Sequence, residues 1–198
     1  GSTWSDLSQG GNDGSITGAS YNSEGYFTFD GSNDYVDLGN ALSVSTGDFS
    51  LSAWVNCNSF SDRRIIAQKG RAGSYAYVGY RLLLDPNRKI DFFTNGENNN
   101  QFSMLSSNPL SIDTWSLVTV TRSGSNAKIY LNSALEADSS GSEPSSLDSS
   151  LDLVIGYDKY HSVWPFSGSI STFKIYSKAL SASEVTQNFN ANKSRFGL

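Results

Sequence analysis

The chain has 198 residues, which suits one domain with one core, and it carries a formal net charge of −5 at pH 7. Its 14 Lys and Arg residues are scattered, so no basic face can neutralise phosphates, and this argues against nucleic acid as a partner. No run of about 18 apolar residues occurs, which argues against insertion into a membrane.

The composition favours an all-β protein. Aromatic residues make up 13% of the chain, and Ser, Asn and Gly are abundant, a balance typical of short strands and many turns. The single cysteine, Cys57, cannot form an intrachain disulfide, and we expect it to be a small buried residue. Stability must then come from packing.

The first 25 residues are rich in Gly, Ser and Asn and predict an arm with one or two short strands, pinned by Trp4. Residues 26–29 and 35–38 then flank a segment, residues 30–34, with the Asp-Gly and Asn-Asp steps that are common in hairpins. We therefore expect two short strands that pair antiparallel across this turn.

The clearest alternation is at residues 49–56. Phe49 and every second residue to Val55 are apolar and face one way, whereas Ser50, Ser52 and Trp54 face the other. Because a tryptophan stands on the polar side, that side should also be partly covered.

Seven further strands are predicted at regular intervals, separated by turn residues and by a Ser-rich surface loop between residues 136 and 150. They lie at residues 64–68, 75–84, 89–93, 102–105, 115–121, 127–131 and 151–155. About ten to thirteen short strands in all imply a two-sheet antiparallel sandwich, and the lack of a blade-length repeat disfavours a propeller.

The C-terminal part predicts a core strand at residues 166–176 and then the one helix. The apolar positions Ile170 and Phe173 are three apart, where a regular strand requires an even spacing, so we expect a bulge near residues 171–172. Ser181 and Glu184 have the spacing of a capping box, which predicts a helix over residues 181–190. Leu180 can pack on Val185 as a hydrophobic staple.

Six segments, in order and over nearly the whole chain, resemble the laminin-G-like domains of the concanavalin A-like lectin and glucanase superfamily. They are residues 27–36 (FTFDGSNDYV), 49–55 (FSLSAWV), 115–120 (WSLVTV), 128–132 (KIYLN), 168–176 (GSISTFKIY) and 179–185 (ALSASEV). The resemblance implies a single jelly-roll domain, residues 1–198, with one concave and one convex antiparallel sheet.

The two ends of the chain, residues 3–7 and 188–198, are most similar to domains in structural proteins of tailed marine bacteriophages and in bacterial adhesins. This similarity implies a location on a virion or an extracellular surface. Neighbouring virion or adhesin subunits are then expected partners.

Some members of the superfamily are glycoside hydrolases, which need two carboxylates roughly 5 to 9 Å apart. No strand here carries a suitable acidic pair, because the glutamates fall in loops, at strand ends or at the helix cap. The only histidine, His161, lies in a loop. We therefore expect no enzymatic activity, with a glycan lyase or hydrolase as a third alternative.

The turn at residues 30–34 is a candidate calcium site. Asp30, Asn33 and Asp34 place three oxygen-bearing side chains within five residues, and the carbonyl of Gly31 could add a ligand. Relatives place an acidic residue of the last strand beside this turn, whereas the corresponding position here reads Ser171-Thr172. The alternative is that Asp and Asn occur here as turn formers, and no cofactor is otherwise required.

Three loops combine amide, charged and aromatic side chains, the groups that bind sugars. The candidate ligand-binding residues are Arg71 and Tyr75 in the first loop, Asn98 in the second, and Tyr157, Asp158, Tyr160, His161 and Trp164 in the third. The alternative is a solvated third loop in which Trp164 plugs one end of the sandwich.

The function expected from the sequence is a non-catalytic binding or adhesion module on a virion or cell exterior. It would recognise a glycan or a surface protein through loops at the rim of a rigid scaffold. A purely architectural decoration or tail domain is the alternative.

Overall fold

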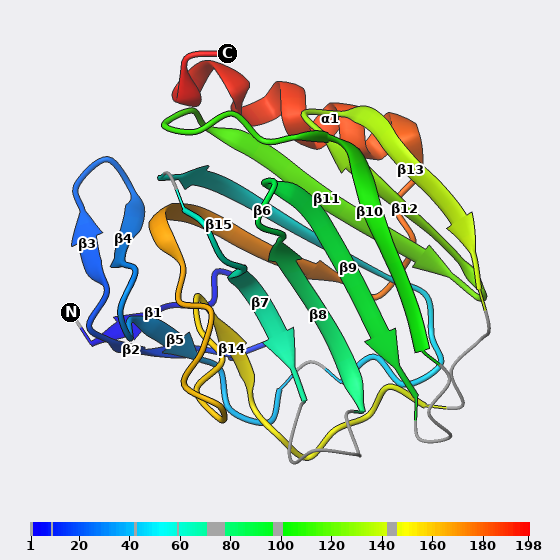
Figure 1. The fold of residues 1–198 in the computed structure, drawn as a ribbon, viewed down its shortest axis with the longest axis horizontal. Coiled ribbons are helices and arrows are strands. Elements are labelled where there is room, and N and C mark those ends of the chain that lie inside the picture. The colour runs from blue at the N-terminus through cyan, green and yellow to red at the C-terminus, as the bar shows by residue number, and fades with distance from the viewer. Residues whose placement is uncertain are drawn as a thin grey trace.

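The computed structural model describes residues 2–8, 10–41, 43–58, 60–70, 78–96, 101–141 and 146–198. In these residues two antiparallel sheets pack face to face, and a C-terminal helix lies outside them (Figure 1). The predicted all-β jelly-roll sandwich with one short helix is confirmed.

The eight-stranded sheet contains, in spatial order, β1 (Thr3–Trp4), β2 (Gly14–Thr17), β5 (Tyr35–Asp37), β14 (Leu153–Ile155), β7 (Arg64–Lys69), β8 (Gly79–Leu84), β9 (Lys89–Asn95) and β10 (Gln101–Pro109). The seven-stranded sheet contains β13 (Ala134–Ser140), β12 (Asn126–Leu131), β11 (Ser116–Ser123), β6 (Phe49–Cys57), β15 (Ser167–Tyr176), β4 (Tyr26–Asp30) and β3 (Ser20–Asn22).

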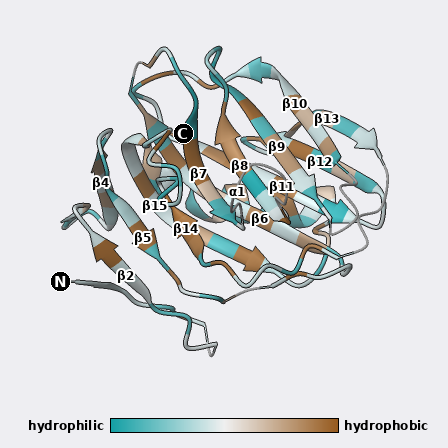
Figure 2. Ribbon diagram, turned by 60° about the horizontal axis from the view of Figure 1, so that its bottom comes forward, coloured by the Kyte–Doolittle hydropathy of each residue, from teal (hydrophilic) through white to brown (hydrophobic). Residues whose placement is uncertain are grey.

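The core lies between the sheets, and hydrophobic positions follow the strands while the loops are mostly hydrophilic (Figure 2). Phe49 and the alternate apolar residues of β6 are at most 1% exposed, as their spacing predicted. The Phe49 ring lies 5.5 Å from that of Tyr80 and 6.3 Å from that of Phe92, so β6 packs across the core on β8 and β9. Cys57 is also buried, and burial raises the pKa of its thiol to about 11.

The C-terminal helix covers the outer face of the seven-stranded sheet (Figure 1). Helix α1 (Ala182–Asn192) starts one residue later than predicted and runs two residues further, into the 3₁₀ helix η1 (Lys193–Phe196). The capping box of Ser181 and Glu184 is confirmed. Trp54 stacks on Phe189 and Phe196 at 5.8 and 4.3 Å, which explains a tryptophan on the polar side of β6.

The predicted hairpin across residues 30–34 is wrong. β4 pairs with β3 and β15 in one sheet, whereas β5 pairs with β2 and β14 in the other. The turn therefore crosses the core from sheet to sheet, and Phe29 and Val36 enter the core from opposite sides. Asp-Gly chemistry fixes the reversal of the chain but not the partner of each strand.

The polar loop predicted for residues 136–150 begins later than expected. β13 continues to Ser140 and pairs with β12 over its full length, apart from one irregularity. A Ser-rich strand is tolerated there because β13 is an edge strand with mostly exposed side chains.

Of the strand predicted at residues 75–84, the structure describes the part from Val78 onward, and in that part the strand begins at Gly79.

The irregularity predicted in β15 is confirmed. Its register against β6 shifts between Ile170 and Phe173. At this shift Ser171 Oγ donates to Gly25 O at 2.9 Å, and pairing with β4 ends at Ile170. The described part of the N-terminal arm holds three short strands, one more than the one or two predicted. Trp4 contacts Phe27 at 4.6 Å between ring centroids, as its pinning role predicted.

Candidate functional site

The loop between β14 and β15 leaves the eight-stranded sheet and returns to it at nearly the same point. Gly156 N donates to Ile66 O at 3.1 Å, and Ile65 N donates to Trp164 O at 3.0 Å. Gly156, just before the loop of residues 157–164, and Trp164, at its end, are therefore both hydrogen-bonded to β7, and these bonds hold the loop beside this strand.

Asp158 shapes the loop from within. It is fully buried, and its Oδ1 accepts hydrogen bonds from the backbone N–H groups of Tyr160 and His161 at 3.2 Å each. Nδ1 of His161 lies at the same distance from that oxygen. Asp158 also bridges to Val163 through the backbone. The carboxylate thus fixes the reversal of the chain and orients the imidazole.

The two tyrosines of the loop seat it on the sheet. Tyr157 is 8% exposed and stacks on Tyr35 of β5, with ring centroids 6.1 Å apart. The hydroxyl of Tyr160 accepts a hydrogen bond from Asp152 N at 2.8 Å. Both side chains therefore serve first to anchor the loop.

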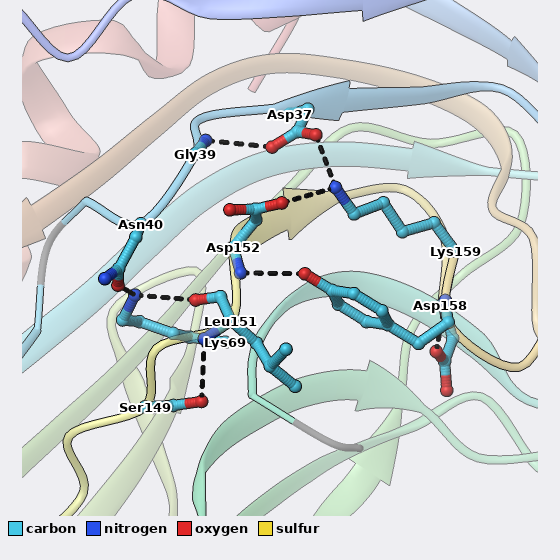
Figure 3. A network of polar contacts seen from close by, with 10 residues as sticks. Asp37, Gly39, Asn40, Lys69, Ser149, Leu151, Asp152, Asp158 and Lys159 are labelled. Atoms are coloured by element: carbon cyan, nitrogen blue, oxygen red, sulfur yellow. Dashed lines mark hydrogen bonds and ion pairs between the residues drawn. The ribbon is translucent and has the colours of Figure 1, made fainter. Parts of the chain in front are cut away.

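Lys159 ties the loop to two neighbouring strands, and Figure 3 shows it pointing between two carboxylates. Its Nζ lies 2.5 Å from Asp37 Oδ2 and 2.6 Å from Asp152 Oδ2. Burial opposes the charged ammonium, but the hydrogen bonds to both carboxylates outweigh it and raise the pKa of Lys159. The hydrogen bond from Lys159 likewise lowers the pKa of Asp152.

A second lysine, which is fully buried, belongs to the same network in Figure 3. Lys69 Nζ donates to Asn40 Oδ1 at 2.9 Å and to Leu151 O at 3.0 Å. Burial lowers the pKa of Lys69. The side chain joins the end of β7 to the segments that flank β5 and β14.

The strand register aligns one row of side chains across the eight-stranded sheet. Neighbours of this row, such as Val36, Ile155, Leu82 and Phe92, belong to the core, so the row faces away from it. We call it the outer row. It consists of Asp37, Val154, Gln68, Arg81, Phe93 and Ser103.

Trp164 lies over the outer row. The guanidinium carbon of Arg81 is 5.2 Å from the centroid of the Trp164 ring and 5.0 Å from that of Phe93. Arg63, which is exposed, lies 5.4 Å from the same indole. We call Arg63, Arg81, Phe93 and Trp164 the arginine–tryptophan patch. Trp164 has a left-handed φ of +57°, a strained conformation for a bulky residue.

Two buried polar groups lie in or next to the outer row. Gln68, fully buried, has both amide atoms without a hydrogen-bond partner in the described part of the chain. Oδ1 of Asp91 is also buried and has no hydrogen-bond partner in the described part of the chain. Burial raises the pKa of the Asp91 carboxyl, although the positive charges of Arg81 and Arg63 counteract this effect. Such groups are rare in proteins and concentrate at functional sites.

The candidate calcium turn is occupied by backbone contacts. Asp34 Oδ2 accepts from Asp30 N at 2.8 Å, and Asp30 Oδ1 accepts from Ser32 N at 2.7 Å. Asp34 is 6% exposed, and burial raises its pKa. Gly31, with φ of +81°, lies against Ser167 at the start of β15. The residue of the last strand that lies beside this turn is therefore Ser167, not Ser171 or Thr172 as expected from the sequence. Calcium binding by Asp30, Gly31, Asn33 and Asp34 stays a prediction.

Of the ligand-binding residues predicted from sequence, the five of the third loop lie together beside β7, and Tyr157, Asp158 and Tyr160 among them make contacts within the protein. Arg71, Tyr75 and Asn98 lie outside the described residues. Sequence reasoning missed Lys159, Arg63 and Gln68 as members of the site. An alternating pattern could place Gln68 on a strand, but only the register shows that it lies beside Arg81.

The part of the chain that the structure describes contains no group of three or more His, Cys, Asp or Glu side chains that could hold a metal ion. In that same part, no helix is long and apolar enough to cross a membrane.

Comparison of the whole backbone with solved structures finds jelly-roll receptor-binding domains. The binding domain of botulinum neurotoxin serotype G matches with a TM-score of 0.72 at 17% identity, over 94% of this chain and 48% of that one. The binding domain of Paraclostridial Mosquitocidal Protein 1 gives a TM-score of 0.72 at 17% identity, over 94% and 49%.

The ligand-binding domain of botulinum neurotoxin serotype D, in complex with N-acetylneuraminic acid, gives a TM-score of 0.71 at 18% identity, over 92% and 47%. This chain thus spans about half the length of each of these domains. At such low identity the likeness shows the fold. A search of curated protein sequences finds no match.

The sequence itself matches a family model. The model is described as the concanavalin A-like lectin/glucanases superfamily, of laminin-G type, and it covers residues 30–186, from the last residue of β4 into helix α1. The chain belongs to this laminin-G-like family of the concanavalin A-like lectin and glucanase superfamily.

Proposed function

We propose that the protein is a non-catalytic carbohydrate-binding module whose ligand lies on the outer row, against the arginine–tryptophan patch. The observation that carries this proposal is the indole of Trp164, held beside two guanidinium groups on a loop fixed at both ends. A sugar offers an apolar ring face to an aromatic ring and hydroxyls to nearby charged groups.

The rigidity of the loop supports this proposal. Asp158 fixes the chain reversal, Tyr157 stacks on Tyr35, and Lys159 is held by two carboxylates. Because these contacts form within the protein, the loop need not be ordered at the moment of binding.

The carboxylate pair at Lys159 is not arranged for hydrolysis. A glycoside hydrolase needs one carboxyl group with a raised pKa that donates a proton, beside a second that stays ionised. Asp37 and Asp152 both pair with Lys159, and the hydrogen bond from Lys159 lowers the pKa of Asp152. The pKa shift at Asp152 is thus opposite to the one that a general acid needs.

The biological role that we propose is adhesion. Toxin domains of the same fold include a receptor-binding domain, and one was solved with N-acetylneuraminic acid, which supports a glycan as the ligand class. Display on a virion or cell exterior would let several weak sites act together through multivalency. Neighbouring subunits of such an assembly would then be further partners.

The test is binding of the isolated chain to a glycan array, followed by titration calorimetry with each ligand found. Trp164→Ala should abolish binding or weaken it at least tenfold, and Arg63→Ala should weaken it less. Lys128→Ala, on the other sheet, is the control and should leave affinity unchanged. If no glycan on the array binds the protein, the proposal is overturned and an architectural role is favoured. If Trp164→Ala leaves the affinity for the glycan unchanged, the binding site does not lie on this face.

A further inference from the structure

A second surface, on the opposite sheet from the outer row, has an open strand edge. β15 pairs with β4 only from Ser167 to Ile170, whereas on its other side it pairs with β6 as far as Tyr176. In the described chain, no strand pairs with residues 171–176 on the β4 side. Backbone donors and acceptors on this edge are therefore available to another extended chain.

A groove of about 900 Å³ runs along the open edge. Residues 172–176 of β15 form one wall and residues 3–8 of the N-terminal arm form the other. Val36 and Ile155, both core residues, lie at its base, so the groove opens between the two sheets.

The side chains that line the groove are largely apolar and incompletely buried. Leu7 is 97% exposed and Tyr21 62% exposed, and both line it. Trp4, Phe173 and Ile175 are half-buried against the core. An occupant that covered these five side chains would gain hydrophobic free energy in proportion to the apolar area removed from water.

The rim of the groove carries positive charge, although the chain as a whole carries −5. Lys174 is exposed on the open edge, and Arg195 lies at the same groove, where it donates to Glu24 O and Gly25 O. The acidic side chain there, Asp6, accepts hydrogen bonds from backbone N–H groups of the arm. An acidic residue on the occupant is thus complementary to Lys174.

From these observations we infer that the groove binds an extended polypeptide strand. This strand belongs to a partner protein, adds to the edge of β15, directs apolar side chains inward at alternate positions, and presents an acidic residue to Lys174. Main-chain hydrogen bonds supply affinity in this mode and the alternate pockets supply specificity. The six residues of the edge match a strand of about 20 Å. The inference is independent of the glycan site.

The test uses an eight-residue synthetic peptide of alternating valine and threonine with a central glutamate. Calorimetry should show binding, and amide hydrogen exchange should slow in residues 171–176. Lys174→Glu should weaken binding at least fivefold and transfer the preference to a peptide with a central lysine. Lys128→Glu, the same charge change on β12, and Trp164→Ala should have no effect.

Three results would overturn the inference. The first is a lack of binding by every such peptide, and the second is binding that Lys174→Glu and Leu7→Asp leave unchanged. The third is a different occupant. A dimer in light scattering that Lys174→Glu dissociates would assign the groove to a second copy of the chain. Peptide binding that disappears in a longer form of the polypeptide would assign it to the chain's own neighbouring segment.

Discussion

Aromatic rings cover the outer face of the seven-stranded sheet, whereas the outer row of the eight-stranded sheet consists mostly of charged and polar side chains. On the first face, Trp54 is 2% exposed beneath Phe189 and Phe196. On the second, Trp164 lies over Arg81, in a row that also contains the buried amide of Gln68.

The difference separates a face that stabilises the fold from the face that we propose binds the ligand. A stack of rings gains free energy by excluding water and leaves no polar group unsatisfied. A buried polar group without a partner, such as the amide of Gln68, costs free energy, and such groups are rare in native proteins. The comparison predicts that mutations on the first face reduce stability and that mutations on the second reduce binding.

The largest expected effect is that of Trp54→Ala. Removing the indole leaves Phe189 and Phe196 without their stacking partner and should reduce the free energy of unfolding by about 3 to 5 kcal/mol. Urea unfolding measures this change. Trp164→Ala, the matched tryptophan on the other face, should cost less than about 1 kcal/mol. If the two variants lose equal amounts of unfolding free energy, the two faces do not differ in their contribution to stability.

Lys159→Met should have the next largest effect. It leaves Asp37 and Asp152 facing each other without the ammonium between them and should cost about 2 kcal/mol. Chemical denaturation at pH 7 measures the change. Lys128→Met, which breaks an exposed pair with Asp138, is the control and should cost well under 1 kcal/mol.

The same pair predicts a pH dependence. Because the hydrogen bond from Lys159 lowers the pKa of Asp152 in the folded state, the pair contributes stability above the unfolded pKa of about 3.9. This contribution is lost as the pH falls through the folded pKa. Below about pH 4 the wild type should therefore lose stability more steeply than Lys159→Met. Parallel curves for the two proteins would contradict the assignment.

Loss of the helix cap should have a smaller effect. Ser181→Ala removes the acceptor for Glu184 N and should cost about 1 kcal/mol, because one N–H at the start of α1 loses its partner. Thermal melting measures the change, with Ser177→Ala, outside the cap, as the control. If Ser181→Ala leaves the melting temperature unchanged, α1 is held by its aromatic contacts alone.

The smallest expected effect is that of calcium. Asp30 and Asp34 already accept backbone N–H groups, with which the predicted ion would compete, so millimolar calcium should raise the melting temperature only slightly and EDTA should reverse the rise. A ligand that binds only the folded state raises the melting temperature by mass action. A rise with calcium that Asp34→Asn abolishes would establish a structural ion in this turn.

Local sequence patterns predicted much of the fold. The alternation at β6, the uneven spacing of Ile170 and Phe173, and the capping box at Ser181 each determine a backbone feature through nearby residues. Strand pairing is different, because it depends on residues far apart. The segments on either side of residues 30–34 entered different sheets although their turn chemistry favoured a hairpin.

The candidate site was predictable only in part for the same reason. The mixture of aromatic and polar residues at 157–164 singled out the loop. The approach of Arg63 and Arg81 to Trp164 could not be foreseen, because it depends on the register between β7 and β8 and on the hydrogen bond from Ile65 to Trp164.

Cys57 makes the protein convenient to label. Its thiol is fully buried in the core, and its pKa of about 11 leaves almost no thiolate at neutral pH. A cysteine introduced on the surface would thus be the one thiol that reacts with a maleimide dye. Fluorophores placed singly beside Trp164 or beside the β15 groove could report occupancy at each surface, without any need to remove the native cysteine first.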